Sequence, residues 1–141
     1  MNNRNYYAFS LVQILAVCAL LWFLFTLPGP WEFQRDFGTV LLLIGVIGLA
    51  AARYQLGRSF AVRAEAHQLV TRGIYSRIRN PIYVFGAILI AGVILILHRP
   101  ALCLFLIAII ILQVVRAHRE ARVLEAAFGD AYREYRRKTW F

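Results

Sequence analysis

The sequence predicts an all-α integral membrane protein with four transmembrane helices, the last two forming a hairpin, and a cytoplasmic amphipathic C-terminal helix. Hydrophobic residues make up 61% of the 141 residues and gather in four long blocks, which is typical of membrane proteins and unusual for a small soluble domain. Arginine-rich stretches separate the blocks, and no run alternates polar and apolar residues as a strand would. We assign residues 1–141 to a single domain. Residues 1–52 form two spans, and residues 53–141 form a loop, the hairpin and the final helix.

The four apolar blocks are each long enough to be a membrane helix when part of their flanks is included. At a rise of about 1.5 Å per residue, the shorter blocks cross a hydrocarbon core of roughly 30 Å only with such extensions. The first block exceeds the core of a signal peptide and no small-x-small cleavage site follows it, so we expect a retained span. The blocks are Ala8–Leu27, Gly38–Ala52, Pro81–Leu97 and Ala101–Val115.

Two connections between the blocks carry helix-breaking residues. Pro28-Gly29-Pro30-Trp31 ends the first helix and supplies an interfacial tryptophan. His98-Arg99-Pro100 is too short for anything but a tight turn, so the third and fourth helices must pack as antiparallel neighbours. Four glycines in the middle blocks predict close packing between helices: Gly45, Gly48, Gly86 and Gly92.

The basic residues predict the orientation in the membrane. With four spans, all of the 16 lysines and arginines except Arg35 and Arg99 fall on one side. The positive-inside rule therefore places both termini and the segment between the second and third spans in the cytoplasm, in a bacterial-type inner membrane. The residues on that side are Arg4, Arg53, Arg58, Arg63, Arg72, Arg77, Arg79, Arg116, Arg119, Arg122, Arg133, Arg136, Arg137 and Lys138.

The net charge of +9 does not indicate a nucleic-acid partner, because the basic residues flank apolar spans instead of forming a basic domain. Anionic lipid headgroups explain the charge better. Cys18 and Cys103 lie far apart inside apolar blocks and lack metal-ligand spacing, so we expect packing residues and neither a disulfide nor a metal site. No G-x-G-x-x-G follows a strand-like run, which excludes a Rossmann domain.

Two polar stretches beside the membrane spans are candidates for chemistry, because polar residues near a bilayer are costly. The first, residues 67–83, leads into the third span, and the second, residues 116–135, leaves the fourth. The tight hairpin returns the chain to the same membrane face. We therefore expect the two stretches to meet and to form one pocket.

The first stretch contains L-V-x-x-G-x-Y-x-x-x-R-N-P-x-Y, and the second R-x-x-x-E-x-x-x-L-x-x-x-F-G-x-x-Y-x-x-Y. Together, at this separation, these motifs closely resemble the isoprenylcysteine carboxyl methyltransferase family and the related phospholipid methyltransferases. The resemblance covers about residues 55–137, whereas residues 1–52 match only as two membrane spans. It implies an S-adenosylmethionine-dependent methyltransferase that acts on a lipophilic substrate at the cytoplasmic face of the membrane.

The resemblance also implies roles for residues of both stretches. Backbone groups and apolar side chains of the first stretch would contact the adenosine, its glycine and tyrosine would shape the loop, and the start of the third span would line the pocket. The fourth span would close the pocket with a charged pair, in which the glutamate binds the cationic end of the cofactor. An arginine would orient a carboxylate acceptor. The cofactor-binding residues are Leu69, Val70, Gly73, Tyr75, Asn80, Tyr83 and Glu120, and the catalytic candidates are Arg79 and Arg116.

Two positions depart from the family pattern, since Asn80 stands where the family usually has His and Ala121 where it has a second Glu. Asn forms hydrogen bonds but does not titrate near neutrality. Asn80 before Pro81 is also a good helix start, so we keep a capping role open beside a pocket role. Arg116 and Glu120 could form an ordinary ion pair, although arginine before glutamate is the weaker order for such a pair.

Several further residues have simpler interpretations than a site role. We interpret Tyr132, Tyr135, Trp140 and Phe141 as interfacial aromatics. Leu124, Phe128, Tyr132 and Tyr135 recur at helical spacing, which predicts an amphipathic tail helix interrupted near Gly129 that lies on the bilayer or covers the site. His67 and His118 are possible bases, but loop histidines beside a membrane are usually solvated.

Methyl transfer from a sulfonium needs positioning more than acid-base chemistry. We expect a carboxylate acceptor resembling a prenylcysteine, and keep open N-methylation of an aminophospholipid, which would need a base such as Glu120. A non-catalytic protein that retains the fold is a rival, as is a membrane reductase, although no cluster of residues is reserved for a dinucleotide.

Overall fold

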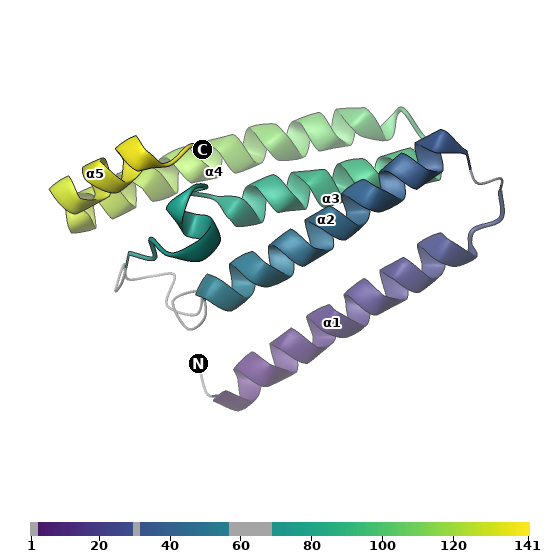
Figure 1. Ribbon diagram of the computed structural model, residues 1–141, viewed down its shortest axis with the longest axis horizontal. Coiled ribbons are helices and arrows are strands. Elements are labelled where there is room, and N and C mark those ends of the chain that lie inside the picture. Colours follow the sequence, from purple (N-terminus) through teal and green to yellow (C-terminus); the bar gives the residue numbers. More distant parts are fainter. Residues whose placement is uncertain (1–2, 30–31, 57–68) are drawn as a thin grey trace.

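The protein is a bundle of long helices followed by a short terminal helix, as seen in a computed structural model that describes residues 3–29, 32–56 and 69–141 (Figure 1). The elements are α1 (Asn3–Thr26), α2 (Phe33–Leu56), the 3₁₀ turn η2 (Gly73–Ser76), α3 (Pro81–Leu97), α4 (Leu102–Phe128) and α5 (Asp130–Lys138). Among the described residues the only β pairing is an isolated bridge between Ile78 and Trp140. The all-helical prediction is therefore confirmed. Of the predicted features, Pro30, Trp31, Arg58, Arg63 and His67 lie outside the described residues.

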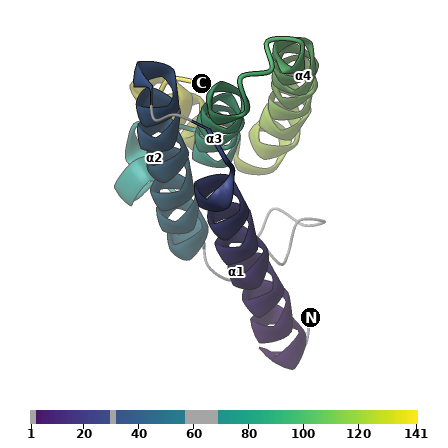
Figure 2. The same cartoon turned by 90° about the vertical axis from the view of Figure 1, so that its right-hand side faces the viewer.

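α1 and α2 are joined at the end of the bundle remote from both polar stretches. α1 ends at Thr26, where the proline-containing connection begins, and Gly29 adopts a φ of +144°. Arg35 is buried, and its guanidinium donates to the carbonyl oxygens of Leu24 at 3.3 Å, Leu27 at 3.0 Å and Gly29 at 3.1 Å. Leu24 lies in the last turn of α1, and Leu27 and Gly29 lie just beyond it, so Arg35 caps the end of α1. Toward its N-terminal end α1 diverges from the other helices (Figures 1 and 2).

α3 lies between α2 and α4 and packs most extensively against α2 (Figure 2). Glycines allow this approach. A Cβ at Gly45 would lie 2.7 Å from Cα of Leu89, and one at Gly92 would lie 2.6 Å from the carbonyl oxygen of Gly38. Gly48 meets the ring of Phe85 in the same way. Close packing is thus confirmed at three of the predicted glycines.

Gly86 does not take part in this close packing. A Cβ there would lie 3.7 Å from Nε2 of Gln113, which is ordinary van der Waals contact. The prediction for Gly86 is therefore wrong, because its side of α3 faces a longer side chain of α4 and not a helix backbone.

The predicted hairpin is confirmed, with His98 at a φ of 53° between α3 and α4. α4 does not stop near Val115, however, and continues as one helix to Phe128, so that its second half projects past the ends of α2 and α3 (Figure 1). Cys18 and Cys103 are free and exposed. Their prediction as packing residues is wrong, since both lie on outward faces of apolar helices that lipid would cover.

Two of the described helices, α2 and α4, are long and apolar enough to cross a membrane. The 17-residue α3 and the Val17–Thr26 part of α1 are apolar but shorter. At about 1.5 Å per residue, α3 by itself reaches only about 25 Å. Apolar helices of this kind support membrane association, while four complete spans remain a prediction.

α5 folds back over the loop before α3, beginning after a break at Gly129 as predicted. Tyr132 and Tyr135 are only 3% and 9% exposed. Their interpretation as interfacial aromatics is therefore wrong: they face the protein, and the exposed face of α5 carries its arginines and lysine. The tail helix therefore packs over the segment just before α3.

Candidate functional site

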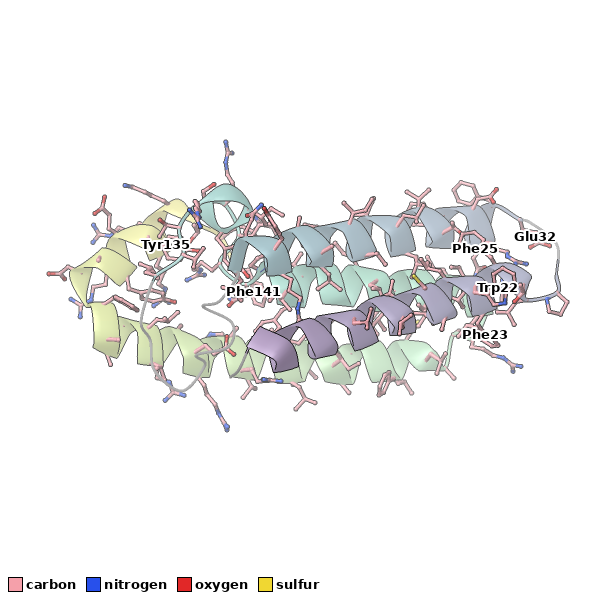
Figure 3. The ribbon with its side chains drawn as sticks, turned by 90° about the horizontal axis from the view of Figure 1, so that it is seen from below. Trp22, Phe23, Phe25, Glu32, Tyr135 and Phe141 are labelled. Carbon is pink, nitrogen blue, oxygen red and sulfur yellow. The ribbon has the colours of Figure 1, made fainter. Side chains whose placement is uncertain are left out.

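The predicted site residues gather at one end of the bundle, where the loop before α3, the start of α3, the second half of α4 and α5 come together (Figure 1). Tyr135 and Phe141 lie at this end, opposite Trp22, Phe25 and Glu32 (Figure 3). The two polar stretches are thus neighbours in space, as the hairpin predicts.

Tyr83 and Glu120 connect the two stretches directly. The Tyr83 hydroxyl donates to Oε1 of Glu120 at 2.6 Å, and both residues are half-buried. Pro81 starts α3, so Tyr83 stands in its first turn, while Glu120 lies in the polar half of α4. A short hydrogen bond from a hydroxyl to a carboxylate is among the stronger kinds. This bond fixes where the carboxylate of Glu120 points.

The loop before α3 is shaped by the turn η2. Gly73 begins it with a φ of +61°, a conformation that glycine adopts without strain. Oε1 of Gln55, at the end of α2, accepts a hydrogen bond from the Ile74 N–H at 2.7 Å. On the other side, the Tyr135 hydroxyl donates to the carbonyl oxygen of Tyr75 at 2.7 Å. The turn is therefore held by two elements distant from it in sequence.

Tyr75 is buried beneath α5 and lies within electrostatic reach of Glu120. Burial, with smaller contributions from the nearby Tyr135 and Glu120, raises the pKa of Tyr75 to about 12. Burial likewise raises the pKa of Tyr135 to about 12, against the opposing effect of Arg79. Both hydroxyls consequently stay protonated at neutral pH, so that Tyr135 remains a hydrogen-bond donor.

Arg79 and Asn80 form the last residues before α3. Nε of Arg79 is buried and has no hydrogen-bond partner within the described part of the chain, a state that a bound acceptor would relieve. Asn80 occupies the N-cap position, but its side chain makes no capping hydrogen bond. Its capping role is thus limited to the backbone, and the side chain remains available for a pocket role.

The last residues of the chain pair with this segment through the backbone. Trp140 N–H donates to the oxygen of Arg77 at 3.0 Å, and the N–H groups of Arg79 and Asn80 donate to Trp140 at 3.1 Å and Phe141 at 2.9 Å. The Trp140 side chain is itself exposed. Sequence patterns did not predict this pairing, because one short backbone bridge between distant segments leaves no periodic signal.

Some predicted residues are not drawn into the cluster. Arg116 is exposed on α4, one turn before Glu120, and Leu69 and Val70 are half-buried in the irregular segment before η2. His118 is exposed, and its Nδ1 lies 2.8 Å from the carbonyl oxygen of Val114 on its own helix. The interpretation of His118 as a solvated residue fits this position.

Two residues of the cluster escaped the sequence-based predictions. Gln55 belongs to no motif, and the one available signal was an uncharged polar side chain at the end of an apolar helix. Tyr135 lies in the second motif, but its spacing did not show which surface it faces. Contacts 19 and 60 residues apart along the chain reveal both roles.

The arrangement combines a fixed carboxylate at Glu120 with a buried guanidinium nitrogen at Arg79 that lacks a partner among the described residues. A zwitterionic ligand that carries an ammonium and a carboxylate fits this pair of charges, and so does a cationic cofactor beside an anionic acceptor. S-adenosylmethionine has such groups, so the residues present fit it. The charged and polar groups of this cluster can bind and orient such a ligand.

Comparison with known proteins relates the chain to a family of methyltransferases. The sequence model of the phospholipid methyltransferase family matches residues 33–131, which extend from α2 to the start of α5. Protein-S-isoprenylcysteine O-methyltransferase B of Arabidopsis thaliana is 29% identical over 139 residues, covering 94% of this chain and 70% of that protein. No solved structure matches the chain.

Proposed function

Because this chain belongs to the phospholipid methyltransferase family, we propose that it transfers a methyl group from S-adenosylmethionine to the carboxylate of a lipophilic, isoprenylcysteine-like substrate at the cytoplasmic face of the membrane. In its coarser form the assignment is already secure. The chain is a membrane-associated methyltransferase of the isoprenylcysteine and phospholipid type. The identity of the acceptor and the use of this cofactor are the proposed parts.

The observation that carries the proposal is the hydrogen bond between Tyr83 and Glu120. It joins the first turn of α3 to the polar half of α4. The carboxylate of Glu120 is therefore held at a fixed place beside the loop that precedes α3. An oriented carboxylate in a half-buried site binds an ammonium group well. Glu120 would therefore bind the cationic end of the cofactor's amino-acid portion, while Leu69 and Val70 would contact its adenosine.

When bound, S-adenosylmethionine supplies a methyl group on a sulfonium that is ready for in-line displacement. The protein's task is then to hold the acceptor oxygen in line with that methyl group and to keep water out. α5 covers this end of the bundle with Tyr132 and Tyr135, which helps to exclude water. A carboxylate is ionised at neutral pH, so no residue has to remove a proton.

Arg79 favours a carboxylate as the acceptor. Its buried Nε lacks a hydrogen-bond partner among the described residues, and a guanidinium pairs with a carboxylate through parallel hydrogen bonds. The name of the Arabidopsis relative describes O-methylation of an isoprenylcysteine, which is a lipophilic carboxylate. Arg116 stays a candidate for a supporting role from α4, where it is exposed at the same end of the bundle.

N-methylation of an aminophospholipid is the second candidate, and the name of the family favours it. An amine must lose a proton before it attacks, and Glu120 is the base available in the cluster. Oε1 of Glu120 already accepts the hydrogen bond from Tyr83, so that oxygen is engaged in holding the carboxylate in place. This contact favours the carboxylate substrate.

The experiment that separates the two uses the purified full-length chain in lipid nanodiscs with methyl-labelled S-adenosylmethionine. One reaction contains a farnesylated cysteine derivative, and the other contains phosphatidylethanolamine. We expect a base-labile methyl ester on the first lipid and no label on the second. A base-stable label on the phospholipid alone would contradict carboxyl methylation.

The Glu120→Gln variant tests whether Glu120 belongs to the cofactor site, with Glu125→Gln as its matched control. Glu125 lies on the same helix and forms an ion pair with Arg133 at 2.8 Å, so the control also removes a paired carboxylate. We expect loss of transfer in Glu120→Gln and near-normal transfer in Glu125→Gln. Equal rates in both variants would remove Glu120 from the site.

A further inference from the structure

We propose that Gln55 and Tyr135 are positioning residues that hold the turn η2 in the shape required for cofactor binding, so that α2 and α5 both contribute to the cofactor's affinity. This inference rests on the proposed function, because it assumes that the cofactor binds beside Gly73–Ser76. Neither side chain needs to touch the cofactor. Each would act through the backbone of the turn.

Gln55 reaches the turn from the end of α2. Its Oε1 accepts the hydrogen bond from the Ile74 N–H at 2.7 Å, and its amide lies directly against Gly73. A Cβ at Gly73 would collide with this amide. Gly73 therefore satisfies two demands, a φ of +61° and the close approach of Gln55. The turn therefore contacts the end of α2 through the Gln55 side chain.

Tyr135 reaches the turn from α5 on the other side. It is 9% exposed, and its hydroxyl donates to the carbonyl oxygen of Tyr75 at 2.7 Å. Tyr132 packs beside it, with ring centroids 6.2 Å apart, which restricts the ring of Tyr135. Ile74 and Tyr75 are neighbours in the chain. The two hydrogen bonds thus hold successive residues of the turn, and they come from two different helices.

The turn gains from this support because it is a single short 3₁₀ turn. A 3₁₀ turn of four residues has poorer hydrogen-bond geometry than an α-helix. Its local bonds include those from the Arg77 and Ile78 N–H groups to the oxygen of Ile74, and one from the Ser76 hydroxyl to the oxygen of Gly73 at 2.6 Å. A loop that must be ordered on binding lowers affinity, whereas a loop ordered beforehand does not. Removing either hydrogen bond should therefore weaken cofactor binding and leave the rate of methyl transfer nearly unchanged.

The test measures KM for S-adenosylmethionine, kcat and the Kd of S-adenosylhomocysteine in full-length variants. Gln55→Met keeps the length of the side chain but removes the amide oxygen, and Tyr135→Phe removes only the hydroxyl. For each, we expect KM and Kd to rise about fivefold, the typical effect of one hydrogen bond, with little change in kcat. Gln55→Glu keeps an acceptor oxygen and should restore wild-type KM.

Matched controls are available in the same chain. Gln34→Met removes the amide of Gln34, which donates to the oxygen of Leu95 at 3.3 Å at the opposite end of the bundle. Tyr54→Phe removes the hydroxyl of a residue that is 88% exposed and precedes Gln55. Both should keep wild-type KM and Kd. A rise in these controls equal to that in Gln55→Met would show a general effect of the substitutions and overturn the assigned role.

Hydrogen exchange of the backbone gives a readout that needs no cofactor. The peptide that contains Ile74 should exchange faster in Gln55→Met than in the wild-type protein, and Gln55→Glu should reverse the change. Unchanged KM and Kd in Gln55→Met and Tyr135→Phe, in a wild-type protein that binds S-adenosylhomocysteine, would overturn this inference alone. A wild-type protein that fails to bind would instead overturn the proposed function.

Discussion

Tyr83 and Glu120 are 37 positions apart, and the distance of 2.6 Å between their oxygens brings the two separate motifs into direct contact. The bond is made by the hydroxyl of Tyr83, so the role of this residue is not limited to the packing of its aromatic ring. Removing the Tyr83 hydroxyl would take away a contact that orients the Glu120 carboxylate. The role assigned to each residue therefore depends on the other.

Tyr83→Phe and Glu120→Gln should each lower kcat/KM for S-adenosylmethionine by about tenfold or more, since hydrogen bonds to charged groups contribute about 1.5–3 kcal/mol. The double variant should lose little more than the worse single variant, because both changes break the same bond. Steady-state kinetics on the three variants measures this coupling. Fully additive losses would show that the two side chains act independently.

The raised pKa values of Tyr75 and Tyr135 predict a pH dependence. Both hydroxyls act protonated, and each pKa is raised in the folded state to about 12. Their stabilising effect is therefore fully present below about pH 10, the pKa in an unfolded chain, and is lost as the pH rises through the folded values.

We expect the affinity for S-adenosylhomocysteine to show no transition from these two tyrosines between neutral pH and about pH 10. In an absorbance titration, Tyr75→Phe and Tyr135→Phe should each remove a tyrosine that ionises late, because burial raises each pKa to about 12. Loss of an early-ionising group in Tyr135→Phe would contradict the buried position of that hydroxyl.

At the scale of the helices, the ends of a helix were predicted accurately where the sequence has a local signal such as a proline or a tight turn. Asn80-Pro81 and His98 delimit α3, and the predicted and observed bounds agree. α2 and α4 are longer than the apolar blocks that predicted them. Their extra turns carry polar residues such as Gln55 and Glu120, which apolar patterns cannot assign to a helix. Those polar turns are the ones that reach the site.

The sequence predicted that glycines allow close contacts between helices, but it did not show which glycines make them. Gly45, Gly48 and Gly92 meet a neighbouring helix closely, whereas Gly86 does not. All four have the same sequence signal, because composition does not show which side of a helix faces its neighbour. The burial of Tyr132 and Tyr135 was missed for the same reason.

Gly92→Ala should destabilise the protein by about 1–3 kcal/mol, because the new methyl group would force the backbones of α2 and α3 apart. Gly86→Ala is the matched control on the same helix, since its methyl group would meet an ordinary contact at 3.7 Å. Thermal unfolding in one detergent compares the two. Equal transition temperatures for both variants would contradict the close approach of α2 and α3.

For the whole molecule, the division of polar residues between the two ends of the bundle is the main organising feature. The turn η2, the end of α4 and α5 lie at one end, and the α1–α2 connection and the hairpin turn lie at the other (Figure 1). The distribution of lysines and arginines predicted which segments share an end of the bundle. Each helix carries the chain to the opposite end, so the number of helices determines where each segment lies. The side of the membrane that each end faces stays a prediction.

Labelling of single cysteines tests that prediction. In a background with Cys18 and Cys103 replaced by alanine, Ser76→Cys and Arg137→Cys should react with an impermeant maleimide from the cytoplasmic side, and Arg99→Cys from the opposite side. All three positions lie outside the membrane helices and are exposed, so access depends on the side alone. Labelling of Ser76→Cys and Arg99→Cys from one side would contradict the hairpin.

The central claim is that the segment before α3 and the second half of α4 bind one cofactor together. Photocrosslinking of labelled S-adenosylmethionine to the full-length protein, followed by peptide mapping, tests it most directly. We predict label within residues 69–83 and 116–125, suppressed by excess S-adenosylhomocysteine. Label confined to the opposite end of the bundle, or label that S-adenosylhomocysteine does not displace, would contradict it.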